Sequence, residues 1–257
     1  MNIKAHIPSE LLMPFIKTYL IIESQKELVN RVLPDTSLAL AFRFKGQVNY
    51  ISEANANPLP SSVISGLRKS VRLINYLKDT STILVLFKET GASAFFKEPL
   101  HELFEESVSL DNFIARHQIS IIEERLAEAK NNNQRVAIIE SFLLSKLYNY
   151  NPDKLISDAI QKIHSTNGIV KIKKLIDTFY ISQDAFEKRF RKTVGTSPKQ
   201  FASIIRMRSI INLKRPSQTP IDMAFDGEYF DQSHFNKDFK LFTGQTPTEF
   251  FKAPSFW

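Results

Sequence analysis

Residues 221–250 read IDMAFDGEYFDQSHFNKDFKLFTGQTPTEF, and a related stretch stands 49 residues earlier in the chain. Residues 172–201 read IKKLIDTFYISQDAFEKRFRKTVGTSPKQF. A repeat in fixed register indicates two tandem copies of one supersecondary unit. The aligned pairs include Tyr180 with Tyr229, Phe186 with Phe235, Phe190 with Phe239 and Gly195 with Gly244.

Each copy predicts a short helix, a turn, a second helix and a sharp stop. In the first copy, Ser182 is expected to cap a helix that Gly195 ends; in the second, Asp231 and Gly244 take these places. A further helix follows at once in both copies, because Ser-Pro or Thr-Pro opens a capping-box pattern with proline at the first helical position. This is the layout of a helix-turn-helix unit, whose second helix stands clear of the body to enter a groove.

The doubled stretch resembles the DNA-binding domain of AraC/XylS-family transcription regulators, through SQDAFEKRFRKTVGTSPKQF at 182–201 and YFDQSHFNKDFKLFTGQTPTEF at 229–250. The resemblance covers about the last third of the chain. It implies two helix-turn-helix units joined by one long helix. The family usually has glycine just before the aromatic residue of the second turn, where this chain has Glu228, so the local turn geometry is expected to differ.

The second helix of each unit presents a polar face opposite its phenylalanines, and the resemblance implies that this face contacts bases and phosphates. In the second copy, Asn236 suits adenine and Lys237 suits guanine. In the first copy, Asp184 and Glu187 repel phosphate and suit only cytosine amino groups; for Glu187 the alternative is an ion pair with Arg191. The candidate DNA-binding residues are Ser182, Gln183, Asp184, Glu187, Lys188, Arg191, Gln232, Ser233, His234, Asn236, Lys237 and Lys240.

The helix predicted from Pro198 to about Leu213 sets the distance between the two units. At ~1.5 Å per residue such a helix spans roughly 24 Å, which with the widths of the units lets both recognition helices reach successive major grooves about 34 Å apart. We expect Arg206 and Arg208 either to contact phosphate or to be solvated. The residues expected to pack the helix against both units are Phe201, Ile204, Ile205 and Ile211.

Charge is unevenly distributed along the chain. The whole chain has a formal net charge of +7, and residues 151–257 hold 17 Lys and Arg against 11 Asp and Glu, a net of +6. Residues 1–150 hold the remaining 17 against 16, a net of +1. A basic excess in the segment that carries the doubled motif favours a phosphate-binding module over an ordinary Lys-rich surface.

Composition excludes several other classes. The absence of cysteine excludes disulfides, cysteine-based zinc fingers and cysteine nucleophiles. No apolar run approaches the ~20 residues of a membrane span, and the start MNIKAHIPSELL lacks the apolar core of a signal peptide. We therefore expect a cytoplasmic protein with no membrane partner. The five histidines are scattered without metal-ligand spacing, so no metal, cofactor or catalytic residue is assigned and no enzymatic activity is expected.

Residues 1–112 read as a β-rich domain, a cupin-like barrel or sandwich. Leu33-Pro34-Asp35, Ser65-Gly66-Leu67 and 91–111 resemble the uncharacterised sensor-type domain that precedes many such regulators. We expect a short helix at 9–16, a loop at 55–62 and an apolar effector pocket lined by Phe and Tyr from 15–96. The predicted strands are Phe15–Ile22, Leu28–Leu33, Ser37–Phe44, Val48–Ile51, Val71–Tyr76 and Ile83–Phe87.

Residues 113–150 are predicted to form a helical hairpin, and 151–257 the DNA-binding domain. The hairpin is either an ordinary packing element or a homodimer interface. The resulting α+β chain is interpreted as a sequence-specific transcription regulator of duplex DNA, responsive to a small-molecule effector, with RNA polymerase as a partner if it is an activator. Two alternatives stay open: a cupin-like small-molecule-binding protein or enzyme with an autoregulatory DNA-binding tail, and an architectural DNA-binding protein with no effector.

Overall fold

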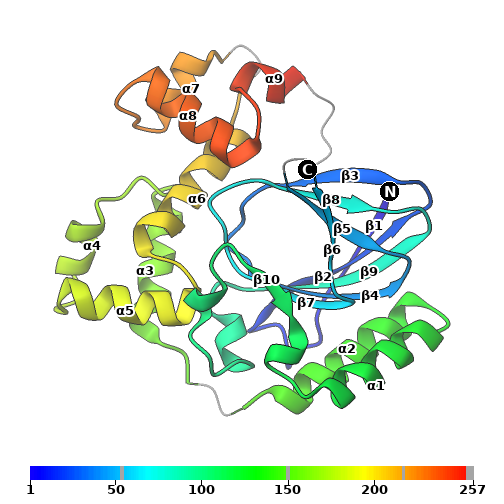
Figure 1. Ribbon diagram of the computed structural model, residues 1–257. Helices are drawn as coiled ribbons and strands as arrows, with labels where there is room; N and C mark the ends of the chain where they lie inside the picture. Colours follow the sequence, from blue (N-terminus) through cyan, green and yellow to red (C-terminus); the bar gives the residue numbers. More distant parts are fainter. Residues whose placement is uncertain (53–54, 149–150, 216–217, 253–257) are drawn as a thin grey trace.

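The computed structural model describes residues 1–52, 55–148, 151–215 and 218–252. Within these residues the strands form two antiparallel sheets, which face each other as the walls of a barrel-like domain (Figure 1). The six-stranded sheet runs β1 (Asn2–His6), β2 (Ile16–Ser24), β9 (Thr80–Phe87), β4 (Ala39–Lys45), β7 (Ser62–Ser65), β10 (Ser107–Ser109). The four-stranded sheet runs β3 (Leu28–Val32), β8 (Arg72–Tyr76), β5 (Val48–Ser52), β6 (Asn55–Pro58).

The six-stranded sheet has one face toward the barrel interior and one toward a helical hairpin. Successive side chains of a strand point to opposite faces, so Leu40 and Phe42 of β4 are fully buried on the hairpin side. The Phe42 ring meets that of Phe142 edge-on at 5.9 Å between centroids. The hairpin consists of α1 (Arg116–Glu128) and α2 (Asn132–Lys146), and Figure 1 shows it covering this outer face. The predicted hairpin is thus confirmed over the described residues; residues 149–150 lie outside them.

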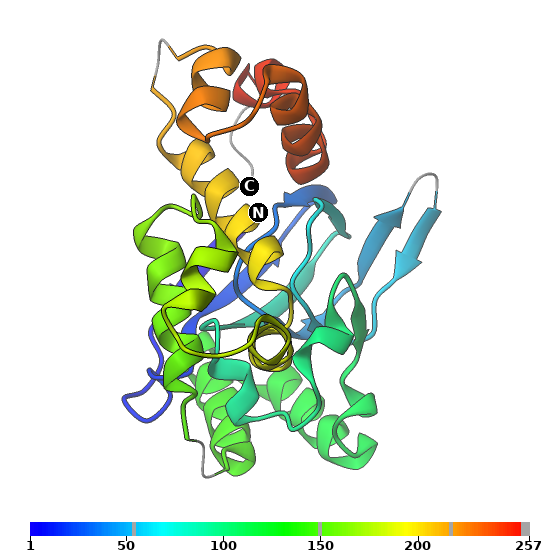
Figure 2. The ribbon, with the colours of Figure 1, turned by 90° about the vertical axis from the view of Figure 1, so that its left-hand side faces the viewer.

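Two sequence predictions in the N-terminal half are wrong, and three strands were missed. The predicted loop at 55–62 holds strand β6, which pairs with β5 and projects as a hairpin (Figure 2). Pro58 is tolerated there because β6 is an edge strand. Strands β1, β7 and β10 were not predicted, because they are short or carry little alternation. The segment at 9–16 forms hydrogen-bonded turns that lead into β2, not a helix.

Three 3₁₀ helices lie between β9 and the α1–α2 hairpin, and the C-terminal helices follow the hairpin. The 3₁₀ helices are η1 (Gly91–Ala94), η2 (Leu100–Leu103) and η3 (Leu110–Asn112). The C-terminal helices are α3 (Lys154–Ser165), α4 (Ile172–Asp177), α5 (Gln183–Val194), α6 (Pro198–Asn212), α7 (Pro220–Asp226), α8 (Gln232–Thr243) and α9 (Pro247–Lys252).

These helices form two units on either side of α6, and each unit docks on the barrel at its own point. The α4–α5 unit packs on η2, where Gly195 approaches Leu100 so closely that an added Cβ would lie 3.2 Å from the Leu100 carbonyl oxygen. The α7–α8 unit meets the start of β8, where Val71 N donates to Leu241 O at 3.3 Å. Figure 2 shows α8 next to the edge of the barrel.

Candidate nucleic-acid interface

Two phenylalanines of helix α5 pack into the core, and the helix begins and ends at the residues that the sequence predicts. Ser182 caps the helix, its Oγ accepting from Ala185 N at 3.3 Å. Phe186 and Phe190 are fully buried, with ring centroids 5.8 Å apart. Gly195 ends the helix at φ 92°, a left-handed conformation that glycine adopts without a Cβ penalty. The opposite face is therefore fixed toward solvent.

Helix α8 repeats this arrangement. Asp231 Oδ1 accepts from His234 N at 2.7 Å, and Phe235 and Phe239 are fully buried, with ring centroids 5.5 Å apart. Gly244 closes the helix at φ 77°. Since α5 and α8 have the same length and begin 49 residues apart, the repeat in the sequence corresponds to a repeat in the fold.

The predicted DNA-binding residues all lie on α5 and α8 or at the N-cap of α5. Most are exposed, and Glu187 and Asn236 are half-buried. The exposed ones are Ser182, Gln183, Asp184, Lys188, Arg191, Gln232, Ser233, His234, Lys237 and Lys240. Their exposure leaves both polar faces accessible, but it does not test contact with DNA, which stays a prediction.

Local ion pairs distinguish the two faces. On α5, Arg191 Nη2 lies 3.7 Å from Glu187 Oε2, and Gln183 Nε2 donates to Glu187 Oε1 at 3.1 Å. The alternative considered for Glu187, an ion pair one turn along the helix, is present. In contrast, none of the ion pairs among the described residues involves Lys237 or Lys240 of α8. The exposed lysines of α8 thus differ from Arg191 of α5, whose guanidinium is paired with Glu187.

His234 is held by neighbours within its own unit. Its Nε2 lies 3.6 Å from Asp238 Oδ2, and its ring meets Tyr229 edge-on at 5.3 Å. Burial is the main cause that raises the pKa of Tyr229 to about 12, against the opposing charge of Arg206. Tyr229 therefore acts as a neutral packing group under the N-terminal end of α8.

The turns before the two recognition helices differ by one residue. Phe179 stacks on Phe186 at 6.1 Å between centroids, as Tyr229 packs on Phe235 at 5.3 Å. Phe179, and not Tyr180, is therefore the structural counterpart of Tyr229, and the alignment of the two tyrosines is wrong at this point. Tyr180 is 99% exposed.

Glu228 stands in the left-handed conformation, at φ 51°. This backbone region favours glycine, which is the residue that the resemblance predicts at this position. Glu228 therefore adopts the turn conformation that glycine would adopt, but its Cβ makes this conformation sterically unfavourable.

Helix α6 joins the units with the predicted apolar face: Phe201, Ile204, Ile205 and Ile211 are all buried. The prediction for its arginines is wrong. The Arg206 guanidinium lies 4.2 Å from the Tyr229 ring centroid, and Arg208 pairs with Asp35 of the barrel at 3.0 Å. A sequence pattern shows that these side chains lie outside the apolar face of α6, but it does not reveal which partner each of them meets.

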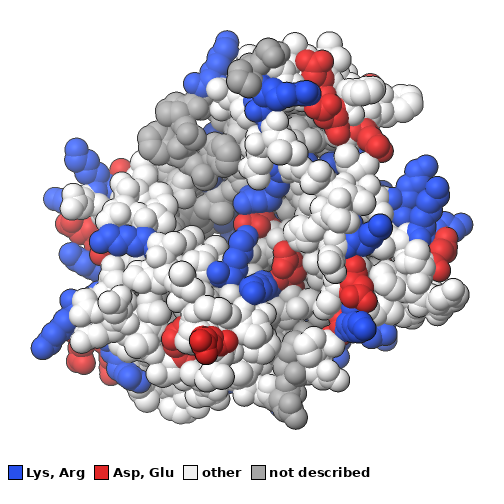
Figure 3. All heavy atoms as spheres, turned by 180° about the vertical axis from the view of Figure 1, so that it is seen from behind, with Lys and Arg blue, Asp and Glu red and all other residues white. Residues whose placement is uncertain are grey.

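Basic side chains do not gather in one patch on the face seen in Figure 3, where acidic residues stand between them. On this face, no broad basic surface is available to attract DNA.

The barrel contains the predicted pocket, although its lining differs from the prediction. A cavity of about 500 Å³ lies between the two sheets. Its wall is mostly aliphatic, as with Leu84 and Leu86 of β9, and Tyr76 is the aromatic residue that contributes. The phenylalanines are absent from the lining of the described cavity because Phe42 and Phe87 are buried in the main core, on the opposite face of the sheet. Alternation alone does not reveal which face of a sheet meets a cavity.

The described residues offer neither a metal site nor a membrane-spanning helix. No group of three or more His, Cys, Asp or Glu side chains there could hold a metal ion. In the same part of the chain, no helix combines the length and the apolar character needed to cross a membrane.

Comparison with known proteins gives two family matches. The family described as "Helix-turn-helix domain" matches residues 175–253. A domain of unknown function (DUF6597) matches residues 4–109. The first match spans α5 and α8, and the second covers the barrel.

Individual relatives are distant. The Msm operon regulatory protein of Streptococcus mutans is 26% identical over 182 residues, which are 69% of this chain and 63% of that protein. The chain therefore spans less than two thirds of the length of this relative. The structure of ToxT from Vibrio cholerae superposes with a TM-score of 0.48 at 9% identity, covering 98% of each chain. A structure of the xylose-binding transcription activator xylR is 21% identical over 42% of this chain and 29% of that chain, with a TM-score of 0.36.

Proposed function

We propose that this protein is a sequence-specific regulator of transcription whose C-terminal domain is of the AraC type; the helix-turn-helix match at residues 175–253 supports this proposal. In this proposal α5 and α8 enter successive major grooves of duplex DNA. The proposal assigns no catalytic activity. It takes the barrel of residues 1–112 as the sensor domain, 113–150 as a linking hairpin and 151–257 as the DNA-binding domain.

The observation that supports this function best is the matched pair of exposed polar helix faces. Each face is fixed by two buried phenylalanines beneath it and by a capped N-terminus. The α6 helix between them is anchored at its N-terminus, where Ser197 Oγ accepts from Gln200 N at 3.1 Å. A rigid connection of this kind would present both faces to one duplex at a fixed separation.

The direct test selects duplexes bound by the full-length protein from a random pool and measures their affinity by mobility shift. We expect enrichment of sites with two short blocks of fixed sequence, one for each recognition helix. Affinity should fall steeply with salt, because neutralising phosphates releases counterions. The matched variants are Lys237→Ala on α8 and Lys78→Ala, an exposed lysine in the β8–β9 turn.

The outcomes separate the proposal from its rivals. Loss of affinity in Lys237→Ala but not in Lys78→Ala supports the interface. Equal affinity for selected and scrambled duplexes would identify an architectural protein instead. Turnover of a small molecule by the purified chain would favour the enzyme alternative. A folded chain with no salt-dependent binding to any duplex would refute the proposal.

A further inference from the structure

The barrel cavity combines an aliphatic wall with an excess of positive charge. Along β4, Ala39 and Ala41 face the cavity, and their small side chains leave it open. Its volume of about 500 Å³ lies in the range of small-molecule sites. Five arginines and one aspartate also line it, a formal excess of four positive charges: Arg31, Arg43, Arg68, Arg72, Arg208 and Asp35.

Two of these arginines, Arg68 and Arg72, line the same cavity, and the charge of Arg72 acts on Arg68. Burial, followed by the neighbouring charge of Arg72, lowers the pKa of Arg68 to about 10. The charges of Glu105 and Glu106 act in the opposite direction, but neither is in an ion pair with Arg68 among the described residues. Like charges in a partly buried wall destabilise each other, and an anion between them would relieve that repulsion.

Arg72 is oriented by its surroundings. Its guanidinium carbon lies 4.6 Å from the centroid of the Tyr50 ring. Its Nη2 donates to Glu105 O at 3.3 Å, and its Nη1 donates to Ser107 Oγ. Its Nε is buried and has no hydrogen-bond partner in the described structure. The side chain is therefore positioned in advance while part of its donor capacity is unused.

The cavity wall has a second group of polar side chains, on β4 and β9. Thr82 of β9 is 4% exposed, and its Oγ1 has no hydrogen-bond partner among the described residues. Arg43 of β4 stands directly opposite Thr82 in the strand register. Buried polar atoms are normally paired, so these groups also favour a ligand with polar atoms over a pure hydrocarbon.

We propose that this cavity binds a small organic anion with an apolar body, whose anionic head lies between Arg68 and Arg72. Both a carboxylate and a phosphate monoester satisfy this chemistry, because guanidinium groups form strong charge-assisted hydrogen bonds with either. The apolar body packs along the wall of β4 and β9.

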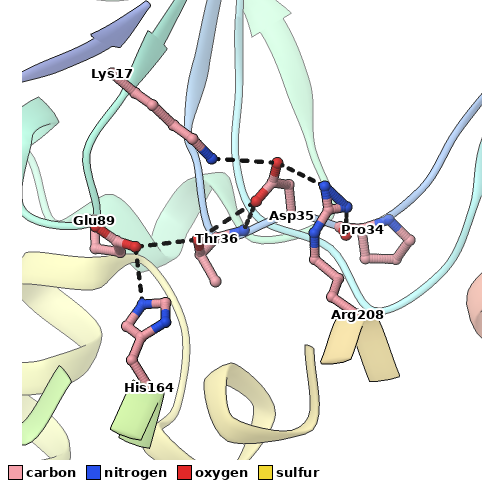
Figure 4. Close-up of polar contacts among 7 residues, drawn as sticks. All are labelled: Lys17, Pro34, Asp35, Thr36, Glu89, His164 and Arg208. Carbon is pink, nitrogen blue, oxygen red and sulfur yellow. Dashed lines mark hydrogen bonds and ion pairs between the residues drawn. The ribbon is translucent and has the colours of Figure 1, made fainter. Parts of the chain in front are cut away.

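The cavity also touches the DNA-binding half of the chain, which gives a route for regulation. Arg31 lines the cavity and donates to Gln245 Oε1 in the α8–α9 turn. Arg208 lines it and holds Asp35 (Figure 4). With its head between Arg68 and Arg72, a ligand that fills the cavity would lie against Arg31 and Arg208 through its apolar body, and so would change the docking of both α6 and α8. This step rests on the proposed function, whereas binding itself does not.

The first test measures binding to the full-length protein by titration calorimetry, without DNA. The probes are decanoate and decyl phosphate, each at concentrations where it is monomeric, with decanol and acetate as controls. We expect at least one anionic amphiphile to bind tenfold or more tightly than decanol, and acetate to show no binding. Preference between the two probes identifies the head group. Equal binding of decanol and both anions, or no binding of either anion, overturns the proposal.

Two variants test the site by different means. Arg68→Gln removes the charge that lacks an acidic partner, and loss of one charge-assisted hydrogen bond should weaken anion binding about tenfold or more. Ala41→Leu fills the cavity without changing its charge and should weaken binding of decanoate and decanol alike. Lys78→Gln, an exposed change in the β8–β9 turn, should leave binding unchanged. If the first two variants stay folded by circular dichroism and bind the anions as the parent does, the site is refuted.

A DNA arm tests the regulatory step separately. The better anionic probe is added to a complex of the parent protein with its selected duplex, and to the Arg68→Gln complex. We expect the probe to change duplex affinity in the parent and much less in Arg68→Gln. A probe that binds in calorimetry but leaves duplex affinity unchanged refutes the coupling alone. Absence of duplex binding without any probe is a failure of the proposed function, and it leaves the calorimetric result standing.

Discussion

Arg208 of α6 donates from Nη2 to Asp35 Oδ2 at 3.0 Å and from Nη1 to Pro34 O at 3.2 Å. These bonds join the helix between the two helix-turn-helix units to the loop that follows β3 (Figure 4). Lys17 Nζ lies 3.9 Å from the same carboxylate oxygen. A polar contact that one substitution can remove thus links α6 to the barrel.

The Arg208–Asp35 pair should contribute a modest coupling energy. Their side chains are 35% and 27% exposed, so solvent screens the pair, and we expect a coupling of about 0.5–1 kcal/mol. A double-mutant cycle with Arg208→Ala and Asp35→Ala, followed by urea unfolding, measures it. Arg208→Lys retains the charge but not the two-pronged geometry, and should recover only part of the loss. A coupling of zero would show that the contact does not hold the domains together.

A second interdomain contact should make stability depend on pH. Burial raises the pKa of Glu89, but hydrogen bonds from His164 and Thr36 outweigh it and leave its pKa below the ordinary value of 4.5. A carboxyl group with a lowered folded pKa stabilises the fold fully above its unfolded pKa, and the stabilisation is lost as pH falls through the folded pKa. The parent should therefore lose more stability than Glu89→Gln below about pH 4.5. Urea unfolding of both proteins from neutral to acid pH tests this; parallel curves would contradict it.

Glu228→Gly should stabilise the second unit. A residue with a Cβ in the left-handed conformation costs about 1–2 kcal/mol, and the greater freedom of glycine in the unfolded chain takes back about 0.4–1 kcal/mol. At φ 51° we therefore expect a net gain of about 0.5–1 kcal/mol in the free energy of unfolding. Glu228→Ala is the matched control, because it removes the charge but keeps the Cβ. A similar gain in both variants would attribute the effect to charge.

The two recognition helices should respond differently to loss of one charge. Lys237→Ala should cost about 1–3 kcal/mol of duplex binding if the lysine contacts guanine, with specificity relaxed at one position. Glu187→Ala frees Arg191 from its partner at 3.7 Å, so affinity for random DNA should hold or rise. Mobility shifts on a selected and a scrambled duplex at equal salt compare the variants. Equal loss on both duplexes in a folded Glu187→Ala protein would give the glutamate a structural role.

The C-terminal half was predictable in detail because its signals are local. Helix caps such as Ser182 and stops such as Gly195 act within one turn of the chain, and the structure confirms both. The repeat also identified the buried phenylalanines. The turn before α5 was misaligned by one residue, because Phe179 and Tyr180 are both aromatic and only tertiary packing decides which one is buried.

The barrel was predictable as a class but not in its arrangement. Strand β6 has little apolar character, and its pairing with β5 supplies the partners that a sequence pattern does not show. The arginines of the cavity were missed for a related reason: Arg43 and Arg72 occupy inward positions of alternating strands, but whether an inward position meets core or cavity depends on the opposite sheet. Likewise, Arg208 could be placed outside the apolar stripe of α6, while Asp35 lies 173 residues away in the chain.

Arg31 and Arg208 each line the cavity and also contact a partner across the boundary between the barrel and the C-terminal helices. This double role has a thermodynamic consequence. If an anion in the cavity changes duplex affinity by some factor, thermodynamic reciprocity requires the duplex to change anion affinity by the same factor. The operator is then itself an effector of the sensor, and the concentration at which the anion acts depends on how much of the protein is already on DNA.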